Sequence, residues 1–131
     1  MPVERSYWAV RGATTVERDD PELIAGAVHE MLAAIETLNA LTPDLVVSAL
    51  FTMTEDLRSE FPARAARDHG WNDVAMLSTV EIPVPGSLER CIRALVHVEF
   101  PVPRDHVHHV YLRAARALRT DLPPSPPAGA D

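Results

Sequence analysis

The alternation of hydrophobic and polar positions is clearest between Cys91 and Phe100. A period of two residues predicts a β-strand with one buried face. One face would be wholly apolar and would pack against a helix or the core: Ile92, Ala94, Val96, Val98 and Phe100. The other face mixes charged with apolar side chains: Cys91, Arg93, Leu95, His97 and Glu99. We expect this second face to point toward a binding site, a subunit interface or water.

Three further segments carry strand patterns. Residues 7–14 combine aromatic and β-branched side chains and end in Gly-Ala-Thr, with a second threonine directly after, which is typical of a strand. Residues 45–53 form an almost continuous apolar run, the pattern of a central strand. Residues 75–80 predict a third strand, which the loop around Pro83, Pro85 and Gly86 connects to the strand at 91–100.

Two segments carry helical patterns. The sequence Asp20-Pro21-Glu22 predicts a helix start, because aspartate caps free N–H groups and proline suits the first helical position. This helix should run to about Asn39. One apolar stripe would lie on the sheet: Leu23, Ala27, Val28, Met31, Leu32, Ile35 and Leu38. A short helix is predicted over 61–69, since Pro62 stands near its start and Gly70 just past its end.

The C-terminal part of the chain allows two interpretations. Residues 109–119 are rich in Ala, Leu and Arg, and this composition favours a helix. The same segment also alternates in polarity, as a strand would, although the residues alone favour the helix. A chain of 131 residues suits one domain with its own core. We expect that domain to span 1–121 and the Pro-rich residues 122–131 to form a mobile tail.

Composition narrows the possible partners. The formal net charge is −7, which argues against nucleic acid, because phosphate binding requires a basic surface. All 12 cationic residues are arginines, whose planar groups can grip carboxylates with two hydrogen bonds. Cys91 is the only cysteine, so no disulfide can form within the chain. No apolar run is long enough to span a membrane and no signal peptide is evident, so we expect a cytoplasmic protein.

The candidate chemistry centres on a carboxylate and an arginine. Glu81 precedes the Pro-rich loop, and Arg93 lies within the strand that follows it. A charged side chain in a half-apolar strand usually has a partner, although a solvated arginine is the commoner case; the same holds for Arg11. The histidines at 97, 106, 108 and 109 lack the spacing of a zinc site, so no metal is expected. Neither a phosphate-binding glycine motif nor a nucleophile with its base is present. These residues favour an arginine-rich pocket for a small dianion.

A series of motifs resembles one enzyme family, the monofunctional chorismate mutases of the trimeric AroH class. The motifs cover nearly the whole chain from Arg11 to Leu122 and occur in the family's order. They are RGATTVERD at 11–19, FPARAAR at 61–67, GW at 70–71, Glu81, GSLERCIR at 86–93, P-x-D-x-x-x-HVYL at 103–112 and LRTDL at 118–122.

The resemblance implies an α+β fold. The subunit would have a five-stranded mixed β-sheet, one long helix and one short helix. Three subunits would form a homotrimer, a pseudo-α/β barrel with active sites at the subunit interfaces. In this family the segment at 109–112 would be a strand, against its helical propensity.

The reaction that the resemblance implies is the Claisen rearrangement of chorismate to prephenate, without cofactor or metal. Such a step needs a compact substrate conformer and fixed charges where charge develops. Arg93 would donate to the ether oxygen and to a substrate carboxylate. Glu81 would accept from the ring hydroxyl and lie near the developing positive charge.

The remaining site residues follow from the same resemblance. Arg11 and Tyr111 would hold a carboxylate, and Leu118 and Arg119 would close over the pocket. Ser78 stands where the family often has cysteine, and it could still hydrogen-bond the ring hydroxyl. Four residues of one segment would border the pocket from across a subunit interface: Phe61, Ala63, Arg64 and Arg67.

Two other functions remain open from the residues. A trimeric imine or enamine deaminase of the RidA type has a similar fold and also binds a carboxylate through arginine. A non-catalytic trimeric sensor of carboxylates would keep the arginine pocket but would need no carboxylate opposite Arg93. The RGATTVERD motif and the set of Glu81, Arg93, Arg11 and Tyr111 argue against the deaminase.

Overall fold

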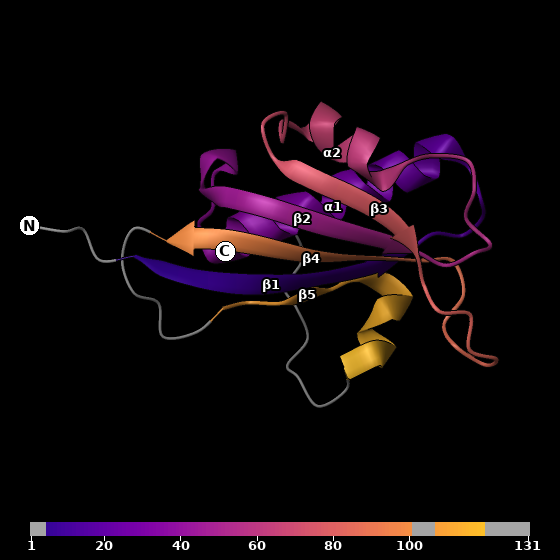
Figure 1. The fold of residues 1–131 in the computed structure, drawn as a ribbon. Helices are drawn as coiled ribbons and strands as arrows, with labels where there is room; N and C mark the ends of the chain where they lie inside the picture. Colours follow the sequence, from indigo (N-terminus) through magenta and orange to yellow (C-terminus); the bar gives the residue numbers. More distant parts are fainter. Residues whose placement is uncertain (1–4, 101–106, 120–131) are drawn as a thin grey trace, which may run out of the picture.

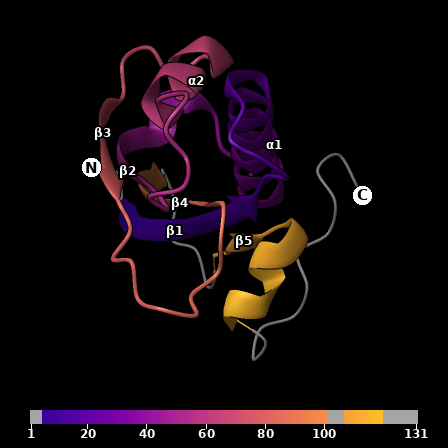
Figure 2. The same ribbon diagram turned by 90° about the vertical axis from the view of Figure 1, so that its right-hand side faces the viewer.

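The computed structural model describes residues 5–100 and 107–119. The chain forms a five-stranded sheet in the order β3-β2-β4-β1-β5, with two helices on one face (Figure 1, Figure 2). The elements are β1 (Ser6–Thr15), α1 (Pro21–Asn39), β2 (Val46–Met53), α2 (Pro62–His69), β3 (Ala75–Val80), β4 (Cys91–Phe100) and β5 (Val110–Tyr111), with short 3-10 helices η1 (Pro43–Leu45) and η2 (Arg113–Arg119). The sheet is mixed, because β4 runs antiparallel to β1 and β2, whereas the β2–β3 and β1–β5 pairs are parallel.

Most predicted elements are confirmed with boundaries that differ by one or two residues. The long helix begins at Pro21, and the Asp20 side chain accepts hydrogen bonds from the backbone N–H groups of Glu22 and Leu23. It ends at Asn39, as predicted. The predicted α+β class and five-stranded mixed sheet are also confirmed.

The C-terminal segment combines the two structures that its sequence allowed. Val110 and Tyr111 form a short strand beside β1, as the family resemblance implied. The next turn is a 3-10 helix from Arg113 to Arg119, in line with the Ala-rich composition. The change occurs at Arg113, whose φ is 53°. Residues 122–131, predicted as a mobile tail, lie outside the described residues.

The apolar face of β4 packs against α1 in the core, as the alternation predicted. Ile92, Val96 and Val98 are fully buried. Gly12 on β1 allows a close approach of the helix, because a Cβ atom there would lie 2.9 Å from the Cδ1 atom of Ile35. One residue of the other face departs from the expectation: Cys91 is buried at the start of the strand.

The short helix α2 is held against α1 by a shared carboxylate. Glu36 on α1 lies 2.6 Å from the Nε2 atom of His69, at the end of α2. Its second oxygen accepts from the indole N–H of the fully buried Trp71 at 3.2 Å. The two contacts of Glu36 hold the end of α2 against α1, and α2 lies beside the edge strand β3. The segment that carries Phe61, Ala63, Arg64 and Arg67 is therefore anchored to the core.

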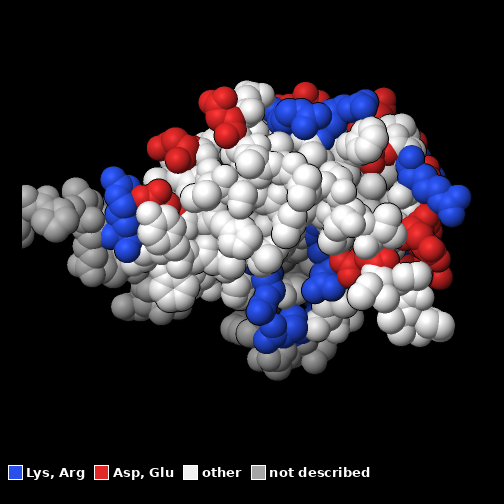
Figure 3. All heavy atoms as spheres, viewed as in Figure 1, with Lys and Arg blue, Asp and Glu red and all other residues white. Residues whose placement is uncertain are grey.

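Neither α1 nor α2 covers the opposite face of the sheet, called the open face below (Figure 2). Among the described elements, only η2 packs on one end of it, where Ala115 clusters with Ala13 and Tyr111. Several large apolar side chains are exposed on the strands. Leu77 is 67% exposed and Leu50 40% exposed. In Figure 3, which views this face, its centre carries no charged side chains and arginines gather below it. Large exposed apolar side chains on an uncharged surface are typical of a contact with another protein or a ligand.

Candidate active site

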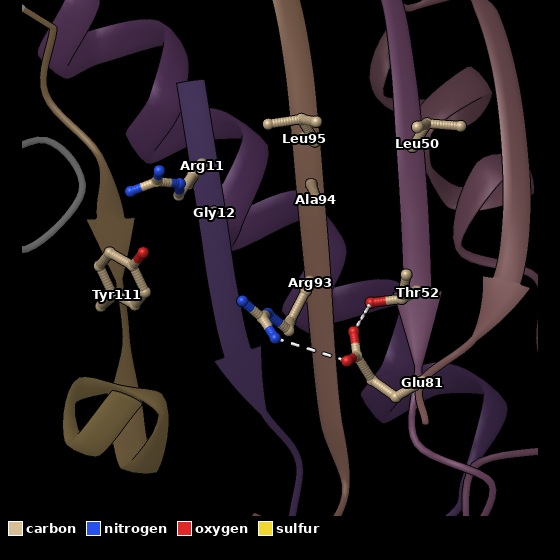
Figure 4. A pocket seen from close by; sticks show the side chains of 9 residues that line it. All are labelled: Arg11, Gly12, Leu50, Thr52, Glu81, Arg93, Ala94, Leu95 and Tyr111. Carbon is tan, nitrogen blue, oxygen red and sulfur yellow. Dashed lines mark hydrogen bonds and ion pairs between the residues drawn. The ribbon is translucent and has the colours of Figure 1, made fainter. Parts of the chain in front are cut away.

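A cavity of about 330 Å³ opens on the open face, where β2, β4, β1 and β5 lie side by side. Its size is that of a site for a small molecule. Figure 4 shows its lining, called the arginine pocket below: Arg11, Gly12, Leu50, Thr52, Glu81, Arg93, Ala94, Leu95 and Tyr111. The pocket thus brings together four of the predicted site residues: Arg11, Glu81, Arg93 and Tyr111. They come from separate elements and lie up to 100 positions apart in the sequence.

Arg93 and Glu81 face each other across the end of the sheet. Arg93 lies on β4, on the face opposite the core, in register with Thr52 on β2. Glu81 follows β3, and its backbone N–H donates to the Met53 carbonyl at 2.9 Å. The Nη1 atom of Arg93 lies 3.4 Å from Oε1 of Glu81. The Arg93 side chain is 45% exposed and that of Glu81 25% exposed, so both can reach a ligand.

Arg11 and Tyr111 lie on the other side of the pocket, on β1 and β5. Pairing of Ala13 with Tyr111 places the two strands next to each other. The Nδ1 atom of His109 accepts a hydrogen bond from the backbone N–H of Arg11 at 3.0 Å. Burial, followed by the positive charges of Arg11 and Arg119 and by His108, lowers the pKa of His109. A neutral His109 therefore suits its role as an acceptor that ties the segment before β5 to β1.

Three other predicted site residues line a second cavity, of about 290 Å³, called the Phe61 cavity below. It is bordered by Phe61, Arg64 and Ser78. The guanidinium of Arg64 lies over the Phe61 ring, 5.3 Å from its centroid. Phe61 itself is 60% exposed. A large aromatic ring so exposed, next to a cation, is typical of a surface that contacts a ligand or a partner.

The family resemblance placed Ser78 beside the ring hydroxyl that Glu81 would bind. Within one chain, however, Ser78 lines the Phe61 cavity. It is in register with Phe51, whose side chain is fully buried under the helices, and residues paired in a ladder share a face. Ser78 therefore points to the side of the sheet opposite Arg93.

The four remaining predicted residues line neither cavity. Ala63 is buried at the start of α2, and Arg67 is exposed on the same helix. Leu118 packs against Tyr111 and Ala115 from η2, so this turn supports the floor of the arginine pocket. Arg119 is half-buried at the end of η2.

One polar residue of the arginine pocket was missed by sequence reasoning. Thr52 lies in the apolar run at 46–53, where a single threonine is unremarkable for a strand. Its hydroxyl donates to Oε2 of Glu81. The signal that could have revealed it is the alternation within that run, which places Leu50 and Thr52 on one face and Phe51 on the other.

The described residues form no cluster of metal ligands and no helix able to span a membrane. In 5–100 and 107–119, no group of three or more His, Cys, Asp or Glu side chains is arranged to hold a metal ion. His106, one of the four histidines considered from the sequence, lies outside these ranges. No helix in the described part of the chain is long and apolar enough to cross a membrane.

Comparison with known proteins gives consistent matches. The family model for chorismate mutase type I matches residues 7–122. A chorismate mutase AroH from Thermus thermophilus is 48% identical over 114 residues, which cover 86% of this chain and 93% of the relative. The AroH protein of Bacillus subtilis is 42% identical over 114 residues, with coverage of 86% and 90%. A solved chorismate mutase structure from Clostridium thermocellum superposes with a TM-score of 0.79 at 42% identity, covering 84% of this chain and 98% of that one.

Proposed function

Because the chain belongs to the type I chorismate mutase family, we propose that the arginine pocket is where it rearranges chorismate to prephenate. The activity follows from the family: the protein is an isomerase of aromatic amino acid biosynthesis. The matched family and relatives give no support to a RidA-type deaminase or a non-catalytic sensor.

The observation that carries the proposal is the facing pair of Arg93 and Glu81 in the arginine pocket. In the rearrangement, the ether C–O bond breaks as a new C–C bond forms, and negative charge develops on the ether oxygen. Arg93 is the cation placed to donate to that oxygen, and a single fixed donor of this kind stabilises a transition state by roughly 3–4 kcal/mol. Glu81, 3.4 Å away, would accept from the ring hydroxyl and face the developing positive charge on the ring.

Arg11 and Tyr111 serve to bind the substrate. Chorismate is a dianion, and a guanidinium binds carboxylates through charge-assisted hydrogen bonds. Arg11 and Tyr111 lie together on neighbouring strands across the pocket from Glu81 (Figure 4). A carboxylate held there and a second contact at Arg93 would keep the substrate in its compact, reactive conformer.

The remaining site residues require a second subunit. Phe61, Arg64 and Ser78 line the Phe61 cavity rather than the arginine pocket. We propose a homotrimer, a pseudo-α/β barrel in which the Phe61 cavity of one subunit meets the arginine pocket of the next. The exposed apolar side chains of Leu50 and Leu77 on the open face support such an assembly. Ala63 and Arg67 would then border the shared site, and η2 with Leu118 and Arg119 would close it.

Two further parts of the proposal concern the whole chain. We assign residues 1–121 to the catalytic domain and 122–131 to a tail, close to the end of the family match at residue 122. We also place the protein in the cytoplasm. A single cysteine that is free and buried fits a reducing compartment.

A direct assay follows the loss of chorismate absorbance with purified protein. Arg93→Ala should lower kcat/KM by about two to three orders of magnitude. Arg93→citrulline, which keeps the shape and removes the charge, should fall nearly as far. Arg18→Ala is the matched control, because Arg18 is exposed and lines neither cavity. Absence of turnover in the wild type would refute the activity, and full turnover in both Arg93 variants would refute the site.

Shared sites can be tested by mixing two inactive subunits. Arg93→Ala damages the arginine pocket, and Arg67→Ala damages the surface that would face it from the neighbour. Co-expression should restore about a quarter of the sites at random mixing, because some interfaces then combine two intact halves. Sedimentation should also give a trimer. A fully active monomer, or no recovery in the mixed trimer, would contradict the proposed interface site.

A further inference from the structure

We propose that Thr52 is a positioning residue for the reaction, because its hydroxyl holds the Glu81 carboxylate away from Arg93. The inference rests on the roles proposed above for Glu81 and Arg93. It concerns the free state of the pocket, before substrate binds.

Thr52 lies at the centre of the pocket's polar end. It occupies β2, between β3 and β4 in the sheet, and is in register with Arg93 on one side and Thr79 on the other. Its hydroxyl donates to Oε2 of Glu81, and Figure 4 shows both contacts of this carboxylate. An ionised carboxylate can only accept hydrogen bonds, so the Thr52 hydroxyl must be the donor. Threonine is also stiff about χ1, which fixes the direction of the donor.

The two oxygens of Glu81 are thus divided between two partners. Oε2 accepts from Thr52, while Oε1 lies 3.4 Å from Nη1 of Arg93. That distance is longer than the 2.7–2.9 Å typical of a charge-assisted hydrogen bond. The Arg93–Glu81 pair is therefore loose, and most donors of Arg93 remain available to a ligand.

Removal of the Thr52 hydroxyl would free Oε2. Arginine and carboxylate prefer a planar pairing with two parallel hydrogen bonds, and the Arg93 side chain is 45% exposed, so it has room to turn. Glu81 would then occupy the guanidinium donors that the ether oxygen and a substrate carboxylate require. Thr52 prevents this self-paired state.

Two variants test the donor. Thr52→Val keeps the shape and removes the hydroxyl, whereas Thr52→Ser keeps the hydroxyl. We expect Thr52→Val to lower kcat/KM about tenfold or more, the typical effect of losing one hydrogen bond to a charged group. Thr52→Ser should recover most of this loss. Thr42→Val is the matched control, because the Thr42 hydroxyl also donates to a carboxylate, that of Asp44, but lies outside the pocket.

Two readouts separate positioning from a structural effect. In a Glu81→Ala background, where no carboxylate remains to be held, Thr52→Val should change kcat/KM by less than about twofold. A crystal structure of Thr52→Val should show both Glu81 oxygens within hydrogen-bonding distance of Arg93. If Thr52→Val itself does not fold, Thr52→Ala provides the same comparison with Thr52→Ser.

The outcomes also separate this inference from the proposed site. If Glu81→Ala and Arg93→Ala lose activity but Thr52→Val retains it, the positioning role is refuted and the site stands. An equal loss for Thr52→Val with and without Glu81 also refutes it. If Glu81→Ala and Arg93→Ala both remain fully active, the proposed site itself fails.

Discussion

Asn39 holds together two parts of the chain that are distant in sequence, so its replacement by alanine should weaken the wall of the arginine pocket. It is the last residue of α1 and is fully buried. Its amide nitrogen donates to the carbonyls of Ile35 at 3.0 Å and His108 at 2.9 Å. Its amide oxygen accepts from the His108 N–H at 2.9 Å. The bonded segment leads directly into β5, which carries Tyr111.

The magnitude follows from these three bonds. Each intramolecular hydrogen bond contributes about 0.5–1.5 kcal/mol to stability. Asn39→Ala should therefore lower the free energy of unfolding by about 2–4 kcal/mol. Part of that loss is local, because the backbone at residue 108 loses both of its bonds to α1.

Urea unfolding at one fixed protein concentration measures the change, since assembly would otherwise shift the result. Asn72→Ala is the matched control, because Asn72 is exposed on a turn, and it should change stability by less than about 0.5 kcal/mol. Amide exchange at residues 107–112 should also accelerate in Asn39→Ala. A loss below about 1 kcal/mol, or exchange as slow as in the wild type, would refute this account of Asn39.

Three further predictions follow from single residues. Gly12→Val should destabilise the fold by about 1–3 kcal/mol, because its Cβ would lie 2.9 Å from Ile35 Cδ1; an unchanged melting temperature would contradict the close packing of α1 on β1. Burial and neighbouring charges such as that of Arg11 lower the pKa of His109. As pH falls below 6.5, the unfolded chain therefore takes up a proton at this histidine more readily than the folded chain does. The contribution of His109 to stability should be complete above pH 6.5 and decrease below it. Urea unfolding between pH 5 and 8 should show a smaller decrease in His109→Gln, and identical pH dependence in both proteins would contradict this. Burial raises the pKa of the Cys91 thiol to about 11, so iodoacetamide at pH 8 should label the native protein much more slowly than the protein unfolded in urea, as mass spectrometry can measure.

The sequence predicted the elements well where local chemistry determines them. The cap at Asp20 and the alternation in β4 each depend on residues close in the chain, and both are confirmed. The segment after His109 was harder, because strand pairing with β1 and the left-handed backbone at Arg113 are set by tertiary contacts. A residue-by-residue propensity cannot include such contacts.

In the site, too, residues recognised from local motifs were predicted, whereas one that depends on the arrangement of the strands was not. Arg93, Glu81, Arg11 and Tyr111 were named from motifs, and the fold brings them to one pocket. Thr52 could not be selected, because its role depends on β2 lying between β3 and β4.

For Ser78, the sequence predicted the residue but not the direction of its side chain. The family resemblance gave its position in the motif, whereas the direction of its side chain depends on the register of β3 with β2. The register of a parallel pair depends on both strands and cannot be predicted from either one alone.

The order of the strands has a consequence for synthesis on the ribosome. β1, which precedes the other described strands in the chain, pairs along its whole length with β4, from Ser6 with Phe100 to Thr15 with Cys91, and on its other side with β5. Until β4 has emerged from the ribosome, the apolar face of β1 can pack against α1, but both of its edges remain unpaired. Exposed strand edges invite aggregation, and pairings between distant segments form slowly. The arginine pocket, which needs β1, β4 and β5 together, must therefore be among the last parts of the nascent protein to form.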